Sequence, residues 1–464
     1  MIHKFNPSIL RAYDIRGIYN QTLFDQDAYY VARSFASFLN KRSQKKVAVG
    51  YDGRKSSPNL RNELIKGLLD SGVEVFEIGV CPTPMLYFAI FNLNCDAGIM
   101  ITGSHNPKNH NGFKMSLKDR PFYGEDIINL DKMCKDEDFI NAKGCINKYN
   151  ILEDYSNRII KDLNISCSEK KLNIAWDCGN GSSGEVIQNI VGKIEANHKL
   201  LYEDIDGDFP NHHPDPTDAK NMQDLIKIVR DNSCDIGIAF DGDGDRIGIV
   251  DDEGEIIWGD QLMIFYARDI LQDNPQATII ADVKASDTLF NEIAKANGKP
   301  IMWKTGHSLI KAKMKEEKAL LAGEMSGHIF FADKYYGFDD AIYAAIRILN
   351  ILSKSNQKLS DMRKSLPKTF STSEIRISCQ DDIKFTLIDQ IKAKLNDKNL
   401  QYSDVDGIRF IKNNGWWLLR ASNTQPVLVA RCEANDKDSL VALKKELTNI
   451  LNDFDTSIPQ ELIN

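Results

Sequence analysis

Residues 46–79 read KVAVGYDGRKSSPNLRNELIKGLLDSGVEVFEIG, in which two β-branched apolar runs enclose an amphipathic stretch. The runs 46–52 and 73–79 predict strands, and 56–72 predicts a helix with Ser57 as N-cap and Pro58 at its first position. The segment therefore predicts a β-α-β unit. Because such strands read as unbroken apolar runs between helices, they favour a largely parallel sheet covered on both faces.

The same alternation of strands and helices returns in the regions 172–194, 234–245 and 277–303. Three apolar strands also run into glycine-rich polar loops at similar intervals along the chain. They are AGIMITGSHN (97–106), IGIAFDGDGD (236–245) and ALLAGEMSGH (319–328). This repetition predicts three related α/β units, each with a polar loop at the corresponding strand end.

After about residue 367 the pattern changes to that of an antiparallel α+β unit. The segments SEIRISC, GIRFIKNNGWWLLRAS and QPVLVARCEA predict strands, with a turn at Asn413-Asn414-Gly415, and 381–395 and 438–452 predict helices. Polar or turn-rich stretches suggest the boundaries between units. The predicted domains are 1–149, 150–254, 255–366 and 367–464.

The composition is that of an ordinary globular protein, with 464 residues of which 42% are hydrophobic and 27% charged. A net charge of −8 argues against general affinity for nucleic acid or membrane surfaces, although a locally basic cleft is compatible with it. Nine scattered cysteines without a C-x-x-C pair predict reduced thiols. No signal peptide or membrane span is expected. We expect a cytoplasmic monomer whose partners are small molecules.

Three aspartates separated by single glycines follow the predicted strand 236–240. They are Asp241, Asp243 and Asp245. Three carboxylates that converge on one point repel each other unless a hard cation neutralises them, which predicts Mg²⁺. An EF-hand would need Gly sixth and Glu twelfth, where this chain has Arg246 and Asp252. A solvated Asp-Gly turn is the alternative, and Arg246 supplies a cation suited to phosphate.

The stretch ITGSHNPKNHNGFK (101–114) places Ser104 beside His105 in a polar loop. A serine hydroxyl is a poor nucleophile at its ordinary pKa, so it needs a base or a covalent task such as carrying a phosphoryl group beside a metal. Adjacency in sequence does not put the histidine ring on the hydroxyl, and no G-x-S-x-G motif supports a catalytic triad. On this stretch alone, a plain polar turn is an equal alternative.

Two further regions carry groups that suit a sugar. GEMSGH (323–328) offers a carboxylate, a hydroxyl and an imidazole, while His307 stands where a helix begins and Lys284 ends a strand. Each could equally be a solvated residue at the end of an element.

The stretch RASNTQP (420–426) connects two predicted strands of the last unit. It holds a guanidinium, two hydroxyls and an amide in one turn, from Arg420, Ser422, Thr424 and Asn423. Together with backbone N–H groups these predict a phosphate cradle, with a bare hairpin connection as the alternative.

Taken together, these motifs resemble those of the phosphohexomutase superfamily, specifically its phosphomannomutase/phosphoglucomutase group. The match runs in family order from RAYDIRG (11–17) through TGSHNP, NGFK, DGDGDR, KTGHSLIK and GEMSGH to RASNT. The resemblance implies three related α/β domains with mixed, largely parallel sheets and a smaller C-terminal α+β domain around a central cleft. It also implies interconversion of hexose 1-phosphate and hexose 6-phosphate, of mannose or glucose, through a phosphoserine and a 1,6-bisphosphate.

The resemblance assigns a role to each candidate residue. Ser104 is implied as the phosphoserine, with Mg²⁺ held by the three aspartates and a phosphoserine oxygen. The phosphoryl-transfer site is expected to include Tyr13, Arg16, Lys114 and Arg246; the sugar contacts Lys284, His307, Glu324, Ser326 and His328; and the distal phosphate contacts Arg420, Ser422, Asn423 and Thr424. Lys114, His105 and His328 are the candidates for the general base. Glucose 1,6-bisphosphate or mannose 1,6-bisphosphate is the implied activator.

Two positions depart from the family pattern: Gln425 stands where relatives often carry Glu, and His110 where an aromatic residue is common. Phosphoglucosamine mutase is the nearest alternative function, but its relatives tend to read R-x-S-G-T in the last loop. A sugar-phosphate binding protein without activity should have lost the serine or a carboxylate. A phosphatase would need water to reach the phosphoserine. The sequence does not choose between mannose and glucose.

Overall fold

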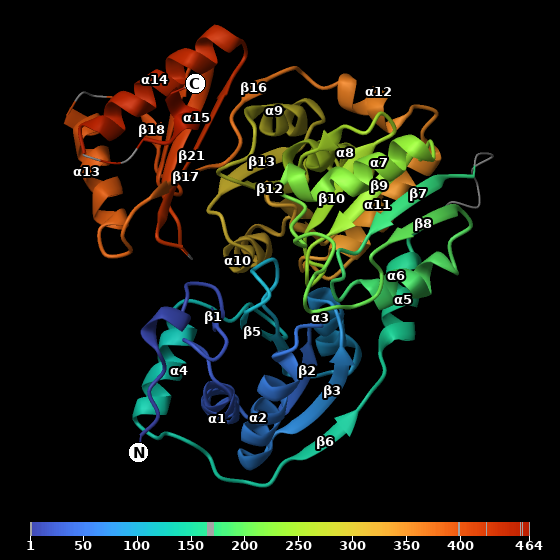
Figure 1. The fold of residues 1–464 in the computed structure, drawn as a ribbon, viewed down its shortest axis with the longest axis vertical. Coiled ribbons are helices and arrows are strands. Elements are labelled where there is room, and N and C mark those ends of the chain that lie inside the picture. The colour runs from blue at the N-terminus through green and yellow to red at the C-terminus, as the bar shows by residue number, and fades with distance from the viewer. Residues whose placement is uncertain are drawn as a thin grey trace.

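The computed structural model describes residues 2–164, 171–397, 400–423, 425–454, 456 and 458–463. The chain forms three α/β units and one antiparallel unit, each built on its own sheet, and Figure 1 shows the fourth set apart from the other three. Within the described residues, no helix combines the length and the apolar character needed to cross a bilayer. The predicted fold class is confirmed.

The first unit carries a six-stranded sheet in the order β1-β5-β4-β2-β3-β6. β2 is parallel to β3 and β4, whereas β5 is antiparallel to β4 and β1. Its elements are β1 (Ile15–Ile18), α1 (Asp25–Asn40), β2 (Lys46–Tyr51), α2 (Ser57–Asp70), β3 (Glu74–Val80), α3 (Thr83–Asn92), β4 (Ala97–Ile101), β5 (His110–Leu117), α4 (Glu125–Lys135) and β6 (Cys145–Lys148), after a 3₁₀ turn at Pro7–Ile9.

The predicted start of α2 was wrong by one residue. Ser56 is the N-cap and Ser57 the first helical residue, so Pro58 stands at the second helical position. The Ser57 hydroxyl donates instead to the Asp52 carboxylate at 2.6 Å. A tertiary hydrogen bond has therefore taken the serine that local capping preferences would have used as the cap.

The second and third units repeat the core of the first. Each unit has four core strands, numbered here from first to fourth along the chain. Across each sheet they lie in the order fourth, third, first, second, with the fourth antiparallel to the third. These orders are β5-β4-β2-β3, β10-β9-β7-β8 and β15-β14-β12-β13. The three glycine-rich loops therefore all connect the third strand to the fourth. This equivalence confirms the predicted repeat.

The second unit contains α5 (Leu152–Ile160), β7 (Asn173–Asp177), α6 (Gly184–Val191), β8 (Asn197–Leu201), a 3₁₀ turn (Ala219–Met222), α7 (Gln223–Asp231), β9 (Ile236–Phe240), β10 (Ile247–Asp251) and β11 (Ile256–Ile257). The third contains α8 (Gly259–Asp273), β12 (Thr278–Asp282), α9 (Asp287–Lys295), β13 (Lys299–Trp303), α10 (His307–Glu317), β14 (Leu321–Gly323), β15 (Ile329–Phe331), α11 (Ala341–Lys354) and α12 (Leu359–Lys364).

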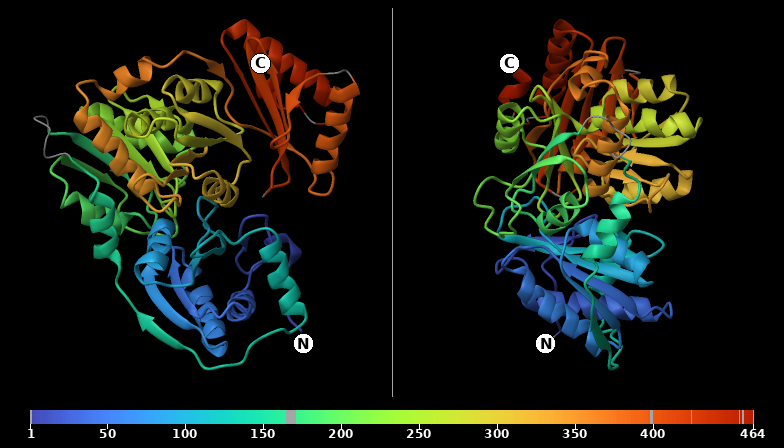
Figure 2. Two further views of the ribbon diagram at one scale, coloured as in Figure 1. Left: turned by 180° about the vertical axis from the view of Figure 1, so that it is seen from behind. Right: turned by 90° about the vertical axis from the view of Figure 1, so that its right-hand side faces the viewer.

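The fourth unit is the predicted antiparallel α+β unit. It contains β16 (Phe370–Ser371), β17 (Ile375–Ser378), α13 (Lys384–Asp397), β18 (Tyr402–Ser403), β19 (Ile408–Lys412), β20 (Gly415–Ala421), β21 (Val427–Ala434), α14 (Lys437–Asn452) and α15 (Gln460–Ile463). Figure 2 shows it at the opposite end of the molecule from the N-terminal unit.

The cores explain why three units form one body and the fourth stands apart. α3 is buried throughout Thr83–Ile90, as expected for a helix that is apolar on every side, and its apolar residues belong to one core cluster with those of the second and third units. The fourth unit has its own core. Its apolar contact with the third is a small cluster that includes Val283, Trp416 and Leu418.

A buried carboxyl group joins the second and third units at Asp340, the N-cap of α11. It accepts hydrogen bonds from the hydroxyls of Tyr155 and Tyr335 and from the backbone N–H of Tyr343, at 2.8–3.0 Å. Burial raises the pKa of Asp340 to about 7. The native protein therefore holds this proton at a pH where the unfolded chain has lost it.

This shift predicts a pH-dependent stability. The pKa of Asp340 is higher in the folded protein than in the unfolded chain. Protonation of Asp340 therefore stabilises the fold to its full extent below the unfolded pKa, and this stabilisation is lost as the pH rises through about 7. Between about pH 5 and pH 8, the Asp340 contribution to the free energy of unfolding should fall by about 2.5 kcal/mol. Asp340→Asn should lack this component. Urea denaturation of both proteins at the two pH values measures it, and equal pH dependence in the two would contradict the assignment.

Candidate active site

Three loops from three units meet at the centre of the site. The serine loop 102–109 follows β4, the acidic loop 241–246 follows β9, and the Glu324 loop, residues 324–328, follows β14. A Cβ atom on Gly242 would lie only 2.6 Å from the Ser104 carbonyl oxygen, so the first two loops can meet backbone to backbone only because this residue is glycine. Arg246 and His328 form an isolated antiparallel bridge between the second loop and the third.

The serine loop holds Ser104 in an unusual backbone conformation. Ser104 has a φ of +49° and is 2% exposed, and its N–H donates to Thr102 Oγ1 at 2.8 Å. Left-handed conformations cost a non-glycine residue energy, so the surrounding structure must impose this one. The hydroxyl oxygen lies 3.1 Å from both Asp241 Oδ2 and His105 Nδ1.

Arg54 holds the backbone of this loop through its carbonyl groups. Its buried guanidinium donates to the carbonyl oxygens of Ser104, Asn106 and Pro107 at 2.6 Å each and to that of His110 at 3.2 Å. Asp52 pairs with Arg54 Nε at 3.1 Å and accepts from the N–H of Gly103. A planar guanidinium with five donors suits this ring of carbonyls in a way that a lysine ammonium does not.

Arg54→Met should therefore destabilise the protein strongly. The substitution keeps an apolar stem but leaves the buried Asp52 carboxylate and several loop carbonyls without their donor, which should cost about 3–5 kcal/mol in the free energy of unfolding. Guanidinium denaturation measures this. Arg42→Met, which removes an exposed arginine, is the matched control and should change stability little. A similar small loss for both variants would contradict the role of Arg54.

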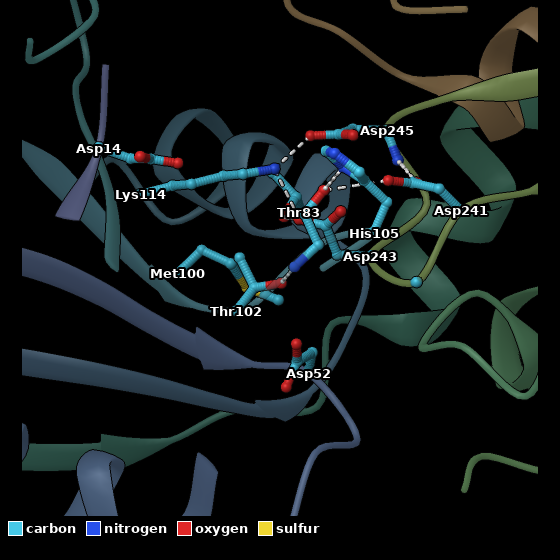
Figure 3. A network of polar contacts seen from close by, with 12 residues as sticks. Asp14, Asp52, Thr83, Met100, Thr102, His105, Lys114, Asp241, Asp243 and Asp245 are labelled. Atoms are coloured by element: carbon cyan, nitrogen blue, oxygen red, sulfur yellow. Dashed lines mark hydrogen bonds and ion pairs between the residues drawn. The ribbon is translucent and has the colours of Figure 1, made fainter. Parts of the chain in front are cut away.

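The acidic loop forms a compact cluster of three fully buried carboxylates, those of Asp241, Asp243 and Asp245. Figure 3 shows Lys114, from β5, reaching between two of them. Its Nζ lies 2.7 Å from Asp243 Oδ2 and 2.5 Å from Asp245 Oδ2. Thr83, the first residue of α3, donates its hydroxyl to Asp243 at 2.5 Å.

The electrostatics of this cluster fit a divalent cation. Burial, and then the charges of Asp245 and Asp243, raise the pKa of Asp241 well above its usual range. Asp243 Oδ1 is buried and makes no hydrogen bond among the described residues. Each of the three carboxylates offers one oxygen, and these oxygens all lie within 4.8 Å of one another. Hard oxygen donors in this arrangement suit Mg²⁺ or a similar ion.

The basic groups around the cluster differ in their protonation. Burial, followed by the charges of Arg246 and Arg16, lowers the pKa of His105 well below its usual value. Burial opposes protonation of His328, but the carboxylates of Asp245 and Glu324 together outweigh it and raise the pKa of His328 to about 9. Burial likewise opposes protonation of Lys114, and Asp243 and Asp245 outweigh it to give a raised pKa.

Two arginines flank the serine loop and the acidic loop. Arg16, on β1, donates to Asn106 Oδ1 at 3.2 Å and to Asp14 Oδ2 at 2.5 Å, and its buried Nε has no partner among the described residues. Arg246 Nε lies 3.3 Å from His328 Nε2. The geometry thus gathers predicted residues from three units within hydrogen-bonding reach of one another.

The Glu324 loop is tied to the acidic loop through His328. Its Nε2 lies 3.2 Å from Asp245 Oδ1, while its Nδ1 lies 2.7 Å from Glu324 Oε2 and 3.2 Å from the Ser326 hydroxyl. Glu324 also accepts from the N–H of Gly306 at 2.6 Å. His307, at the start of α10, lies 3.6 Å from Asp339.

Tyr13 links the first unit to the third and the fourth. Its hydroxyl donates to the Thr305 carbonyl oxygen at 2.8 Å and accepts a hydrogen bond from the Asn423 amide. In the fourth unit Ser422 Oγ accepts from the backbone N–H of Gln425 at 3.2 Å. The predicted phosphate contact Thr424 lies outside the described residues.

The two cations predicted to bind sugar and distal phosphate are both paired with carboxylates. Arg420 donates to Asp406 at 2.9 Å, and Lys284 donates to Glu374 at 3.1 Å. Both cations are buried or nearly so. The structure therefore brings these residues together at the junction of the third and fourth units, around acids that sequence analysis did not identify.

Sequence reasoning also missed Arg54, Asp52 and Thr83. A signal for the first two exists, because DGR (52–54) directly follows β2, the parallel neighbour of β4, and the carboxyl ends of parallel strands share one edge of a sheet. Thr83 carried no such signal, since it begins a helix that reads as a purely apolar core segment.

Comparison with known proteins supports the same assignment. Family models of phosphoglucomutase/phosphomannomutase match all four parts of the chain: α/β/α domain I at residues 7–138, domain II at 153–254, domain III at 258–370 and the C-terminal domain at 374–450.

Curated relatives match nearly end to end. A phosphomannomutase/phosphoglucomutase of Pseudomonas putida is 44% identical, with 94% of each chain covered, and one of Pseudomonas aeruginosa is 42% identical, with 97% of each covered. A crystal structure of a phosphoglucomutase/phosphomannomutase family protein from Burkholderia thailandensis superposes with a TM-score of 0.90 at 38% identity, covering 96% of this chain and 97% of that one. Motifs, fold, site geometry and relatives agree, and the chain belongs to the phosphoglucomutase/phosphomannomutase family.

Proposed function

We propose that the protein interconverts hexose 1-phosphate and hexose 6-phosphate, of mannose, glucose or both, through a phosphoserine at Ser104 and a 1,6-bisphosphate intermediate. One observation carries the proposal: the buried Ser104 hydroxyl lies 3.1 Å from Asp241 in a cluster of three carboxylates, with Lys114 beside it and Arg246 following in the loop. A phosphoryl group on that oxygen would meet cations on several sides, which is the arrangement phosphoryl transfer requires.

The metal proposed for the cluster is Mg²⁺, held by Asp241, Asp243, Asp245 and an oxygen of the phosphoserine. When bound, it would supply a Lewis acid that neutralises charge on the transferring phosphoryl oxygens. Arg16 and Arg246 would bind the remaining oxygens through guanidinium N–H donors, which suit phosphate geometry.

Each half-reaction moves one phosphoryl group and one proton. The sugar hydroxyl oxygen forms a bond to phosphorus as the bond from phosphorus to Ser104 Oγ breaks, and the hydroxyl proton passes to a base. After the bisphosphate turns end for end, the other phosphoryl group returns to Ser104. His105, with its lowered pKa and its Nδ1 3.1 Å from Ser104 Oγ, is suited to exchange a proton with that oxygen.

The base for the sugar hydroxyl is Lys114 or His328. Neighbouring carboxylates raise the pKa of both groups, so both favour the protonated form, which cannot accept a proton. The negative charge of those carboxylates must therefore be neutralised before either group can act as a base. Neutralisation of Asp243 and Asp245 on metal binding would act more directly on Lys114, which contacts both carboxylates.

The sugar and the distal phosphate would bind at the junction of the third and fourth units. Lys284 lies at this junction, where it pairs with Glu374, and Tyr13 joins the first unit to the fourth through Asn423. Glu324, Ser326 and His307 are the further contacts proposed for the sugar. An incoming phosphate would compete with Glu374 and Asp406 for Lys284 and Arg420. Because the fourth unit has its own core, a change in its position offers a way for the intermediate to turn.

Two measurements test the proposal. Glucose 1,6-bisphosphate and mannose 1,6-bisphosphate are the proposed activators. Intact-mass measurement and peptide mapping should find one phosphate on Ser104, either in the purified protein or after incubation with glucose 1,6-bisphosphate. Coupled assays on mannose, glucose, glucosamine and N-acetylglucosamine phosphates should give the highest kcat/KM for mannose or glucose. Absence of phosphate at Ser104 under all conditions would refute the mechanism, and a preference for glucosamine phosphate would favour the alternative enzyme.

The remaining sequence-based expectations stay proposals. They are the domain limits 1–149, 150–254, 255–366 and 367–464, action as a monomer in the cytoplasm, and the absence of nucleic-acid partners. The net charge of −8 supports the last of these.

A further inference from the structure

A second cavity lies between the first and third units, separate from the site described above. Its volume is about 490 Å³, within the range of small-molecule sites. Its walls come from α3 and residues 116–121 of the first unit, and from α10, residues 318–320 and residues 332–338 of the third. The residues proposed to bind metal, sugar or phosphate do not line it. In Figure 1, α10 lies close to the cyan segment that follows β5.

One wall of this cavity is a stack of aromatic rings. Phe91 and Tyr336 stack with ring centroids 4.9 Å apart, and Tyr336 stacks on Phe338 at 5.7 Å with nearly parallel planes. Tyr336 remains 39% exposed, although most large apolar side chains of the protein are buried. The Arg158 guanidinium lies over the Tyr336 ring, 5.4 Å from its centroid, so a further ring would stack against the remaining exposed part of this aromatic wall.

The rim of the cavity is cationic. Lys118, Lys315 and Lys318 are exposed lining residues, and none of the three forms an ion pair with a carboxylate of the described chain. Lys118 Nζ donates to the neutral side chain of Asn94. Lys315 Nζ donates to the carbonyl oxygen of Asp119, the acid among the lining residues, at 2.6 Å. In a protein with a net charge of −8, three lysines without acidic partners around one cavity favour an anion.

We propose that this cavity binds a small anion with a flat aromatic body, whose ring stacks on the wall of Phe91 and Tyr336 and whose charged group meets Lys118, Lys315 and Lys318. The aromatic wall supports the flat ring of the ligand, and the three lysines independently support its negative charge. Because the walls belong to two units, such a ligand contacts both at once. It also contacts α10 one turn beyond His307, since Lys311 lines the cavity and pairs with Asp339 at 2.8 Å.

The test uses 1-anilinonaphthalene-8-sulfonate as the probe, titrated into the whole protein and followed by fluorescence. The wild type should bind it at one saturable site with a Kd on the order of 10–100 µM. The double substitution Lys315→Gln and Lys318→Gln should raise Kd about fivefold or more, because two partners of the sulfonate are lost. Ala332→Phe, which fills the cavity from its wall without changing charge, should abolish saturable binding.

The matched control is Lys313→Gln, on the same helix. Lys313 lies over the ring of Trp303 and pairs with Glu317, and it does not line the cavity. This variant should bind the probe like the wild type, and N-phenyl-1-naphthylamine, the same ring system without the sulfonate, should bind at least fivefold more weakly. Unchanged Kd in the double variant and in Ala332→Phe would overturn the proposal. So would displacement of the probe by glucose 1-phosphate, because that would place it in the substrate site.

Discussion

Replacing Ser104 by alanine is expected to lower kcat by roughly 10⁴-fold or more, the size of effect seen when a covalent nucleophile is removed from an enzyme. The mechanism passes both phosphoryl groups through this one oxygen, so no second route remains in the cluster. The assay is conversion of glucose 1-phosphate to glucose 6-phosphate in the presence of Mg²⁺ and glucose 1,6-bisphosphate.

The fold should survive this substitution. The loop is held through the backbone carbonyls that Arg54 binds and through the Ser104 N–H, and alanine keeps all of these groups. The thermal midpoint should therefore stay within a few degrees of the wild type. Ser34→Ala removes a buried hydroxyl with no hydrogen-bond partner among the described residues, and it should keep full activity. Turnover by Ser104→Ala comparable to that of this control would refute the covalent mechanism.

Asp241→Asn is expected to separate metal binding from folding. Turnover should fall by roughly 10³-fold, because a ligand of the metal and the charge that balances it are both lost. Isothermal titration with Mg²⁺ should show a matching loss of affinity, which gives a readout independent of activity.

The same variant should be as stable as the wild type when EDTA is present. Burial and the neighbouring carboxylates raise the pKa of Asp241, so its side chain favours the neutral form that asparagine imitates. Asn Oδ1 can still accept from the N–H groups of Asp245 and Arg246, as the aspartate does at 3.1 Å. Adding Mg²⁺ should then raise the thermal midpoint of the wild type alone, because a ligand stabilises only the state that binds it.

Two outcomes would contradict this assignment. If Asp241→Asn lost several kcal/mol of stability in EDTA, the carboxylate would serve the fold rather than a metal. If Mg²⁺ stabilised the variant as much as the wild type, the ion would bind elsewhere in the protein.

The cluster of Asp241, Asp243 and Asp245 could be predicted from the sequence because its chemistry is local. Glycines at alternate positions let three carboxylates converge within one loop, and their mutual repulsion already requires a cation. The β-α-β pattern of 46–79 and the repeated strand–loop segments likewise rest on short-range periodicity. These local signals were sufficient for the fold class and for the repeat of three α/β units.

The partners of Ser104 could not be predicted in the same way. Asp241 lies 137 residues away along the chain, and Arg54, which holds the loop, lies 50 residues away on the neighbouring strand end. Nothing in the periodicity of a segment encodes which other segment it will meet, because such contacts depend on how the sheets pack against α3. Local capping preference even pointed to the wrong serine at the start of α2.

The sequence by itself determined the element pattern, the three related units and the acidic loop, since each follows from residue spacing within a few turns or strands. Only the tertiary structure decided that Lys114 bridges two of the aspartates, that His105 is held in its neutral form, and that Glu374 and Asp406 pair with Lys284 of the third unit and Arg420 of the fourth. The physical reason is that burial and charge–charge contacts set these properties, and both arise between groups brought together from different units of the chain.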